Sequence, residues 1–171
     1  PELDRLSNII RAFNQQFGLP AFNQPSGPTF TIAYPSGVGG SDPGWAMETS
    51  LDVEWAHAMA PAANILLVVS RDASVTNLLN AVDYATAQGA HAVSMSWGAL
   101  ESAGDAATNS RFNHPGVSYF ASTGDSGAEV NWPAVSPYVV AVGGTVLSIG
   151  ADGTYVSETA WSGSGGGQSL Y

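Results

Sequence analysis

The chain has 171 residues, of which 44% are hydrophobic, and its 20 glycines and 10 prolines are typical of one compact, loop-rich globular domain over 1–171. Fourteen acidic residues against four arginines and no lysine leave a formal net charge of −10, which argues against nucleic acid or an anionic membrane as a partner. The absence of cysteine excludes disulfides and thiol nucleophiles, and no apolar run approaches the roughly 20 residues of a membrane span.

Helical and extended patterns alternate along the first half of the chain. In chain order they predict a helix over 1–17, a short strand over 29–34, a Gly- and Pro-rich loop over 35–44, a helix over 45–61, a strand over 64–69 and a helix over 76–88. The strand over 64–69 is apolar on both faces, as expected of a buried parallel strand. Gly18 and Gly89 mark the ends of two of these helices.

Strand patterns dominate the second half. They predict strands over 90–97, 116–122 and 138–142, followed by a hairpin of 145–149 with 154–159 around a Gly-Ala-Asp-Gly turn. The residues expected to supply core bulk are Val117, Tyr119, Phe120, Val139, Val140 and Val142. Because strands alternate with helices over short loops, we expect an α/β fold with a mostly parallel sheet flanked by helices. Sites in such folds lie at the carboxyl ends of the strands.

Two carboxylates on the predicted 45–61 helix form the first candidate site. Glu48 and Asp52 are four residues apart and should project from the same helix face. Like charges at this spacing cost an exposed helix a few tenths of a kcal/mol, whereas a partly buried pair that shares a proton can serve acid/base chemistry. The pI near 4.2 also fits a protein meant for acid, where the self-repulsion of its carboxylates relaxes.

A second candidate site follows the predicted 116–122 strand. Asp125 lies between Gly124 and Gly127, in a turn where the backbone can pass close to a ligand. The segment Ser94-Met-Ser-Trp-Gly98 ends another strand and should emerge at the same edge of the sheet. Taken alone, Asp125 is equally compatible with a residue that only shapes an Asx turn.

An ordered set of motifs makes the sequence similar to the sedolisin family, the serine-carboxyl peptidases, which resemble subtilisins. The motifs are Phe17-Gly-Leu-Pro20, Glu48-Thr-Ser-Leu-Asp-Val-Glu-Trp-Ala56, Ala60-Pro61, Ser94-Met-Ser-Trp-Gly98, Ser122-Thr-Gly-Asp-Ser-Gly127, Pro133-Ala-Val-Ser-Pro-Tyr138, Val142-Gly-Gly-Thr145, Glu158-Thr-Ala-Trp161 and Gly165-Gly-Gly-Gln-Ser169. Each motif is weak alone, but their order is specific to the family. The resemblance implies a subtilisin-like three-layer fold and a secreted, acid-acting endopeptidase.

The resemblance also implies roles for individual residues. Glu48 would be the general base for a serine nucleophile, Asp52 would orient it and tune its charge, and Asp125 would be the oxyanion-hole acid. Asp125 must be protonated to donate a hydrogen bond to an oxyanion, so the site should work best in acid. The family adds its peptide or protein substrate along the strand that ends at Gly98. The residues expected on the substrate side are Ser96, Trp97, Gly98 and Gly124.

Other candidates carry simpler interpretations. Ser126 matches the serine motif of chymotrypsin-like proteases, but those enzymes are all-β barrels and this pattern is α/β. His57, His91 and His114 have no ligand spacing, so we expect packed or surface histidines and no metal site. Glu54 is expected to be a solvated charge, and Trp97 is equally compatible with ordinary core packing. The Gly-rich residues 163–167 could be a flexible tail or, as in the family, border the substrate cleft.

The sequence departs from the family in one respect that bears on activity. The family's nucleophile lies in a Gly-Thr-Ser motif, which does not occur in this chain. The family's calcium site and first strand are not matched either, so we expect a catalytic domain incomplete at both ends, with no cofactor of its own. It should be inactive alone, and either held by the remainder of its domain or poorly stable. The alternatives are a non-catalytic peptide-binding relative and a structural α/β domain whose motifs are coincidental.

Overall fold

The computed structural model describes residues 2–171, and their side chains from residue 5 onward. The chain divides into two compact units, Pro1–Gln88 and Gly89–Tyr171. None of the helices in the described range combines the length and the apolar character that a membrane crossing needs.

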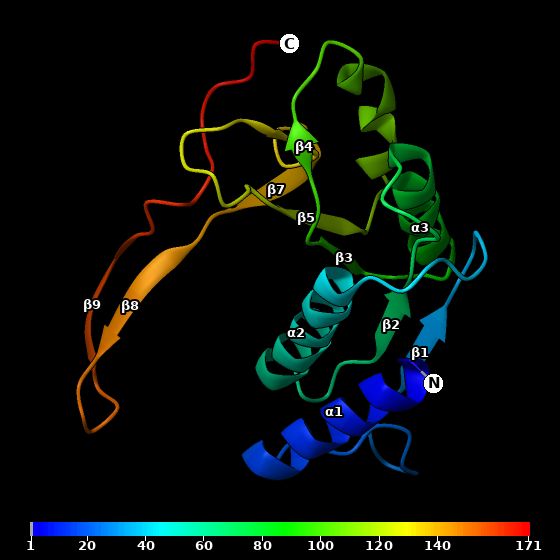
Figure 1. The fold of residues 1–171 in the computed structure, drawn as a ribbon, viewed down its shortest axis with the longest axis vertical. Helices are drawn as coiled ribbons and strands as arrows, with labels where there is room; N and C mark the ends of the chain where they lie inside the picture. The colour runs from blue at the N-terminus through cyan, green and yellow to red at the C-terminus, as the bar shows by residue number, and fades with distance from the viewer. Residues whose placement is uncertain (1) are drawn as a thin grey trace. The chain divides into compact units, whose positions relative to one another are not determined.

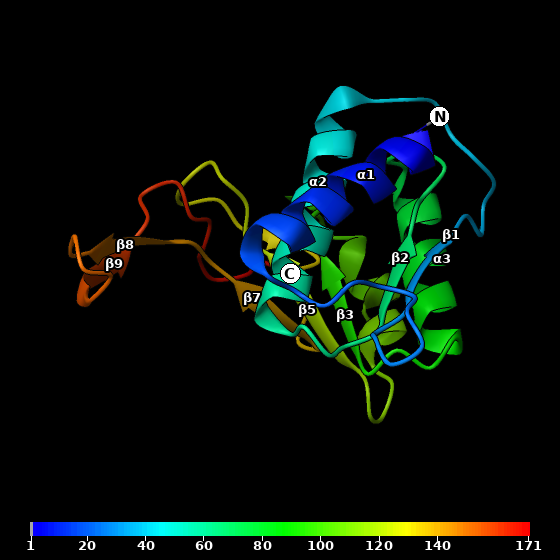
Figure 2. The same cartoon turned by 90° about the horizontal axis from the view of Figure 1, so that it is seen from below.

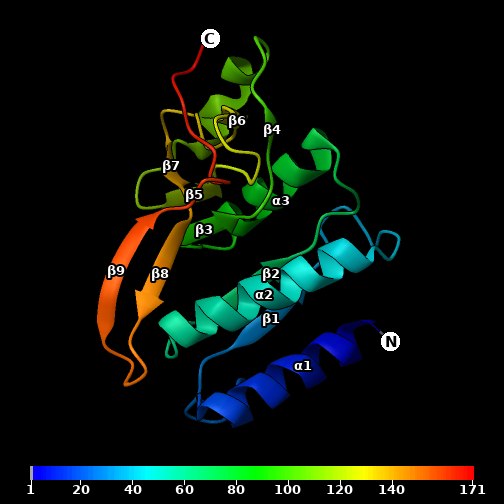
Figure 3. The same ribbon diagram turned by 60° about the vertical axis from the view of Figure 1, so that its left-hand side comes forward.

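The first unit is a pair of parallel strands with three helices. Its elements are α1 (Glu2–Phe17), β1 (Phe30–Ala33), α2 (Pro43–Met59), β2 (Ile65–Val68) and α3 (Val75–Ala87). β1 and β2 pair in parallel, with Phe30 opposite Ile65 and Ala33 opposite Val68. Helices α2 and α3 both pack against β2, and α1 lies beside α2 (Figures 1 and 3).

Local side-chain bonds fix where the helices begin. Asp42 caps α2 because its carboxylate accepts hydrogen bonds from the backbone N–H groups of Gly44 (2.8 Å) and Trp45 (3.1 Å), and Pro43 supplies a preset backbone angle at the first turn. Ser74 caps α3 in the same way, through the backbone N–H of Asn77. These caps satisfy N–H groups that have no partner inside a helix.

A buried histidine ties the loop after α1 to α2. His57, which is 0% exposed, donates from Nε2 to the carbonyl oxygen of Pro20 at 2.8 Å, and its ring lies 4.0 Å from that of Phe22. The amide of Asn14 donates to the same carbonyl oxygen at 3.2 Å. The prediction of a packed histidine is therefore confirmed at this position, and the contacts order the Pro20 loop between the two helices.

The second unit is built around three parallel strands. Its elements are β3 (Ala92–Met95), β4 (Ala99–Leu100), the 3₁₀ helix η1 (Asp105–Phe112), β5 (Ser118–Ser122), β6 (Asn131–Trp132), β7 (Val139–Val142), β8 (Thr145–Ile149) and β9 (Tyr155–Ala160). β5 pairs in parallel with both β3 and β7, so it is the central strand. β4 and β6 form a short antiparallel pair (Figure 3), and β8 and β9 form a hairpin that follows β7 (Figures 1 and 2).

An aromatic cluster fills the core of the second unit. Phe112 and Tyr119 are 2% and 1% exposed, and their ring centroids are 5.7 Å apart. Trp132 packs 5.8 Å from Phe112, and its indole N–H donates to Asn109 Oδ1 at 3.1 Å. The cluster joins η1, β5 and β6, because offset and edge-on aromatic contacts are favourable and the indole N–H needs a partner when buried.

The fold confirms the α/β class and the mostly parallel pairing, with corrections in detail. The predicted helices and longer strands are present, with ends that differ from the predicted ones by at most two residues; Pro1 lies outside the described residues. β4, η1 and β6 were not predicted. The prediction that Val140 and Val142 lie in the core is wrong: they are 52% and 49% exposed, because β7 is the edge strand of the β3–β5–β7 sheet and pairs with β5 on one side.

The start of α3 should stay ordered in acid. Asp72 accepts hydrogen bonds from the hydroxyl and backbone N–H of Ser74 and from the amide of Asn77, and these bonds lower the pKa of its carboxyl to about 2. A carboxyl in the unfolded chain titrates near 3.9, so its stabilising contribution is fully present above about pH 4 and is lost as pH falls towards 2.

We therefore expect Asp72→Ala to lower the melting temperature at pH 7 and at pH 5, with the difference from wild type shrinking between about pH 4 and pH 2. Thermal unfolding followed by circular dichroism measures this. The control is Asn80→Ala, an exposed change on α3 that removes no titratable group. A difference that grew as the pH fell from 4 would contradict the assignment.

Candidate active site

The two carboxylates of the first candidate site lie on α2. Glu48 is half-buried and Asp52 is exposed, and both lie in the interior of the helix, away from its capped start. The four-residue spacing places them on adjacent turns of one helix face, as predicted. A half-buried carboxyl with a second carboxylate one helical turn away is an arrangement that acid/base chemistry can use.

Glu54, on the same helix, departs from the prediction of a solvated charge. Its side chain is half-buried, and burial raises the pKa of its carboxyl above the ordinary value. Glu54 is partly buried because it follows Val53, which is 2% exposed and faces the interior of the first unit. Glu54 is thus a partly buried carboxyl that lies apart from the Glu48 and Asp52 positions in helical phase.

The parallel register places the second candidate site at one edge of the β3–β5–β7 sheet. Met95 at the end of β3 lies opposite Ala121, and Ser122 at the end of β5 lies opposite Val142 at the end of β7. The loops that leave these strands therefore start side by side, as the sequence predicted. The loop of residues 123–130, called here the Asp125 loop, connects β5 to β6.

The backbone of the Asp125 loop is shaped by two glycines. Gly124 and Gly127 have φ angles of +95° and +77°, a region that side chains other than glycine rarely adopt. The side-chain amide of Asn131 donates to the carbonyl oxygen of Thr123 at 2.9 Å. A Cβ on Gly124 would lie only 2.5 Å from the nitrogen of this amide. Asp125 itself is exposed, so its carboxyl group is presented on the surface of a fixed turn.

The predicted substrate-side residues adjoin this loop. A Cβ on Gly98 would lie 3.0 Å from the carbonyl oxygen of Trp132 and 3.7 Å from Cβ of Asn131, so the chain after β3 passes close to β6. Trp97 is half-buried, with its ring 5.9 Å from that of Trp132. Gly98 and Gly124 thus both approach Asn131, while Trp97 packs on the aromatic cluster and keeps part of its surface exposed.

Two residues that shape this site were missed by the sequence reasoning. Asn131 holds the carbonyl of Thr123, and Ser164, in the Gly-rich residues 163–167, has its hydroxyl 3.3 Å from that of Thr123. The Gly-rich composition signalled a segment able to approach another chain closely, but nothing local identified which residue it approaches.

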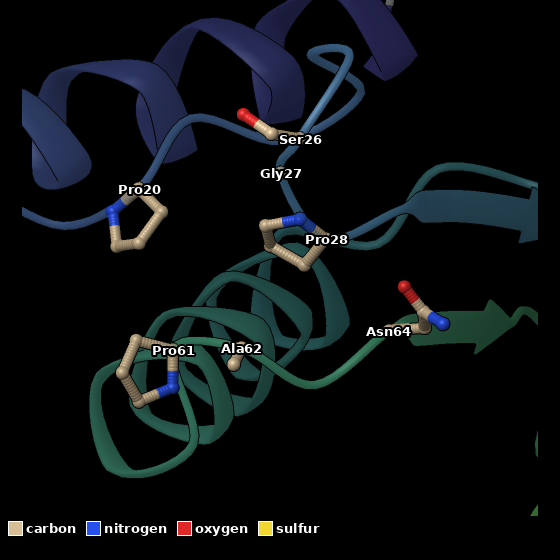
Figure 4. A pocket seen from close by; sticks show the side chains of 7 residues that line it. All are labelled: Pro20, Ser26, Gly27, Pro28, Pro61, Ala62 and Asn64. Carbon is tan, nitrogen blue, oxygen red and sulfur yellow. The ribbon is translucent and has the colours of Figure 1, made fainter.

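A separate hollow lies in the first unit, near the start of its two strands. It has a volume of about 270 Å³ and is lined by Pro20, Ser26, Gly27, Pro28, Pro61, Ala62 and Asn64 (Figure 4). Pro28 and Asn64 lie just before β1 and β2, so the hollow is at the amino ends of these strands. Sites in parallel sheets form at the carboxyl ends of the strands, so this hollow is not part of the candidate active site.

Glu48 and Asp52 belong to the first unit, whereas Asp125 and the substrate-side residues belong to the second. The structure therefore describes two parts of the candidate site, each within its own unit. Across the part of the chain that the structure describes, no three His, Cys, Asp or Glu side chains are grouped to hold a metal ion.

Comparison with known proteins identifies the family. The model of the subtilase family matches residues 37–170. Kumamolisin from Bacillus sp. (strain MN-32) is 34% identical over 160 residues, which are 82% of this chain and 26% of that protein. A solved structure of Pseudomonas sedolisin, a serine-carboxyl proteinase complexed with two molecules of pseudo-iodotyrostatin, matches with a TM-score of 0.77 and 25% identity over 98% of this chain and 55% of that one.

The chain thus spans about a quarter of the length of the curated relative and about half that of the solved structure. The family match covers most of the chain, and the structural match confirms the subtilisin-like α/β fold expected from the motifs. The chain belongs to the subtilase family and, within it, to the sedolisin-type serine-carboxyl peptidases.

Proposed function

We propose that this chain supplies the carboxyl groups of a secreted serine-carboxyl endopeptidase that cleaves peptide bonds in acid. The observation that carries the proposal is the pairing of Glu48 and Asp52 on α2, in a chain whose motifs and fold match those of a serine-carboxyl proteinase. The nucleophile is assigned to a serine of the complete protein outside these 171 residues. The calcium ion that the family resemblance implies is likewise assigned to the complete protein outside these residues.

In the proposed reaction, Glu48 as a carboxylate accepts the proton of the serine hydroxyl while the serine oxygen bonds to the carbonyl carbon of the substrate. Asp125, in its protonated form, donates a hydrogen bond to the oxyanion that develops. Glu48 then returns the proton to the leaving amine as the C–N bond breaks, which leaves an acyl-enzyme that water hydrolyses. Asp52 orients Glu48 and tunes the charge of its carboxyl group.

Acid chemistry explains why carboxyl groups fill these roles. An imidazole base is protonated and inactive near pH 4, whereas a glutamate with an ordinary pKa of about 4.3 can exchange protons there. The histidine on α2 supports this division, because His57 is fully buried and its Nε2 is bonded to the carbonyl of Pro20. The exposed position of Asp125 supports a role at a surface where substrate binds.

The peptide substrate is proposed to lie beside Ser96, Trp97, Gly98 and Gly124. Two features support this: Trp97 keeps part of its ring surface exposed, and Gly98 and Gly124 leave the backbone free of side chains next to the Asp125 loop. An extended peptide can add to such a strand end through backbone hydrogen bonds, with its side chains alternating between pockets.

The general base is tested by Glu48→Gln in the protein expressed from its complete coding sequence. The amide keeps the shape but cannot accept the proton, so kcat at pH 4 should fall by about 10²–10⁴-fold with little change in KM. Hydrolysis of a fluorogenic peptide measures both constants. Glu54→Gln, the same change on the same helix, is the matched control and should retain wild-type kcat. Unchanged hydrolysis by Glu48→Gln would refute the role, and peptide binding without turnover by the wild type would favour the non-catalytic alternative.

The oxyanion acid is tested by comparing two variants of Asp125. Asp125→Ala removes the donor and should lower kcat by about 10²–10³-fold at pH 4. Asp125→Asn keeps an N–H donor that needs no protonation, so it should retain more activity than Asp125→Ala, and it should lose a smaller share of its activity than the wild type between pH 4 and pH 6. The pH dependence of kcat for both variants decides the question. Equal activity of the alanine variant and the wild type would exclude this role.

A further inference from the structure

The Gly-rich segment, residues 163–167, runs along the Asp125 loop and bonds to both sides of Asp125. The backbone N–H of Gly165 donates to the carbonyl oxygen of Gly124 at 3.0 Å, and the N–H of Gly127 donates to the carbonyl of Gly163 at 2.9 Å. The N–H of Gly166 donates to the carbonyl of Glu129 at 3.0 Å. The segment is therefore part of the support of the loop and not a free tail.

The closeness of this contact explains the glycines. A Cβ on Gly165 would overlap the carbonyl oxygen of Thr123, and a Cβ on Gly167 would lie 2.5 Å from a methyl group of Val130. Only a residue without a side chain lets the two backbones approach so nearly.

Ser164, the one residue with a side chain inside the segment, joins three parts of the second unit. Its Oγ accepts a hydrogen bond from the backbone N–H of Gly144 at 3.0 Å and lies 3.3 Å from Oγ1 of Thr123. Thr123 begins the Asp125 loop, and its own N–H donates to the carbonyl of Val142 at the end of β7. The Ser164 hydroxyl thus bridges the turn after β7 and the first residue of the loop after β5.

A carboxylate holds the chain beyond the segment. Glu101, just after β4, accepts hydrogen bonds from the Ser169 hydroxyl at 2.7 Å and from the backbone N–H of Leu170 at 2.9 Å. The N–H of Glu101 donates to the carbonyl of Val130 at 3.0 Å. The Gly-rich segment is therefore held at two points. Ser164 holds it near its start, and Glu101 holds the chain that follows it.

We propose that Ser164 is a positioning residue that sets the orientation of Asp125 through the Gly-rich segment, an inference that rests on the role of Asp125 in the proposed function. Asp125 is exposed and lies between two glycines, so its own side chain has little packing to hold it. The bonds to Gly124 and Gly127 supply the rigidity that a preorganised oxyanion donor needs. Ser164 does not touch substrate in this proposal and acts only through the loop.

The test compares Ser164→Ala with Ser162→Ala in the protein expressed from its complete coding sequence. Ser162 is exposed and two residues away, so its variant should behave as wild type. Ser164→Ala should lower kcat on a fluorogenic peptide at pH 4 by about tenfold or more with KM changed less than twofold, because misplacing a reacting group by about 1 Å can cost 10²-fold. Thr123→Val removes the contact between the two hydroxyls but keeps the bond from Gly144, so it should give a smaller loss of the same kind.

Amide hydrogen exchange supplies a readout that does not depend on activity. The N–H groups of Gly127, Gly165 and Gly166 should exchange faster in Ser164→Ala than in Ser162→Ala while the melting temperature stays close to that of the wild type. If Ser164→Ala does not fold, Thr123→Val carries both measurements. Unchanged kcat in an active protein, or a loss of kcat that follows only the unfolded fraction, would overturn the positioning role.

The two proposals fail in different ways. A wild-type protein without peptidase activity in acid contradicts the proposed function, and the positioning role falls with it. An active wild type in which Glu48→Gln is inactive and Ser164→Ala is fully active contradicts the positioning role alone.

Discussion

The parallel pairing of β5 with both β3 and β7 is the constraint on which the second unit depends. It brings the ends of three strands to one edge, so the chain after Met95, the Asp125 loop after Ser122 and the turn after Val142 start as neighbours. The aromatic cluster of Phe112, Tyr119 and Trp132 then holds β5 against η1 and β6. Because the strands are fixed in this way, the glycines let the Gly-rich segment approach the backbone of the Asp125 loop closely while both segments stay ordered.

A second constraint comes from the chemistry. A site that works in acid cannot rely on imidazole as its base, so carboxyl groups must take the roles of base, orienting group and oxyanion donor while existing in different protonation states. The carboxyls to which we assign these roles lie in different settings: Glu48 is half-buried on a capped helix, and Asp125 is exposed on a glycine-shaped turn. At the start of α3, the hydrogen bonds that lower the pKa of Asp72 keep its carboxyl ionised well into the acid range.

Sequence periodicity predicted the long elements because their signals are local. α1 and α3 repeat an apolar pattern at helical spacing, and β3, β5 and β7 each contain a short run of apolar residues. β4 and β6 have two residues each and η1 lacks an apolar repeat, so no local pattern marks them. The motifs predicted Asp125 and its flanking glycines, but Ser164 bonds to partners 20 and 41 residues away, a relation that only the folded chain contains. The surface position of Val140 likewise depends on what packs over β7.

The central claim, that carboxyl groups perform acid/base catalysis in this protein, is tested most directly by the pH dependence of kcat/KM for the protein expressed from its complete coding sequence. The proposed mechanism needs one carboxyl group as a base and another as a hydrogen-bond donor, so activity should fall on both sides of an acidic maximum. The account predicts a bell-shaped profile with its maximum between about pH 3 and pH 5. A maximum near pH 7 with little activity at pH 4 would contradict it.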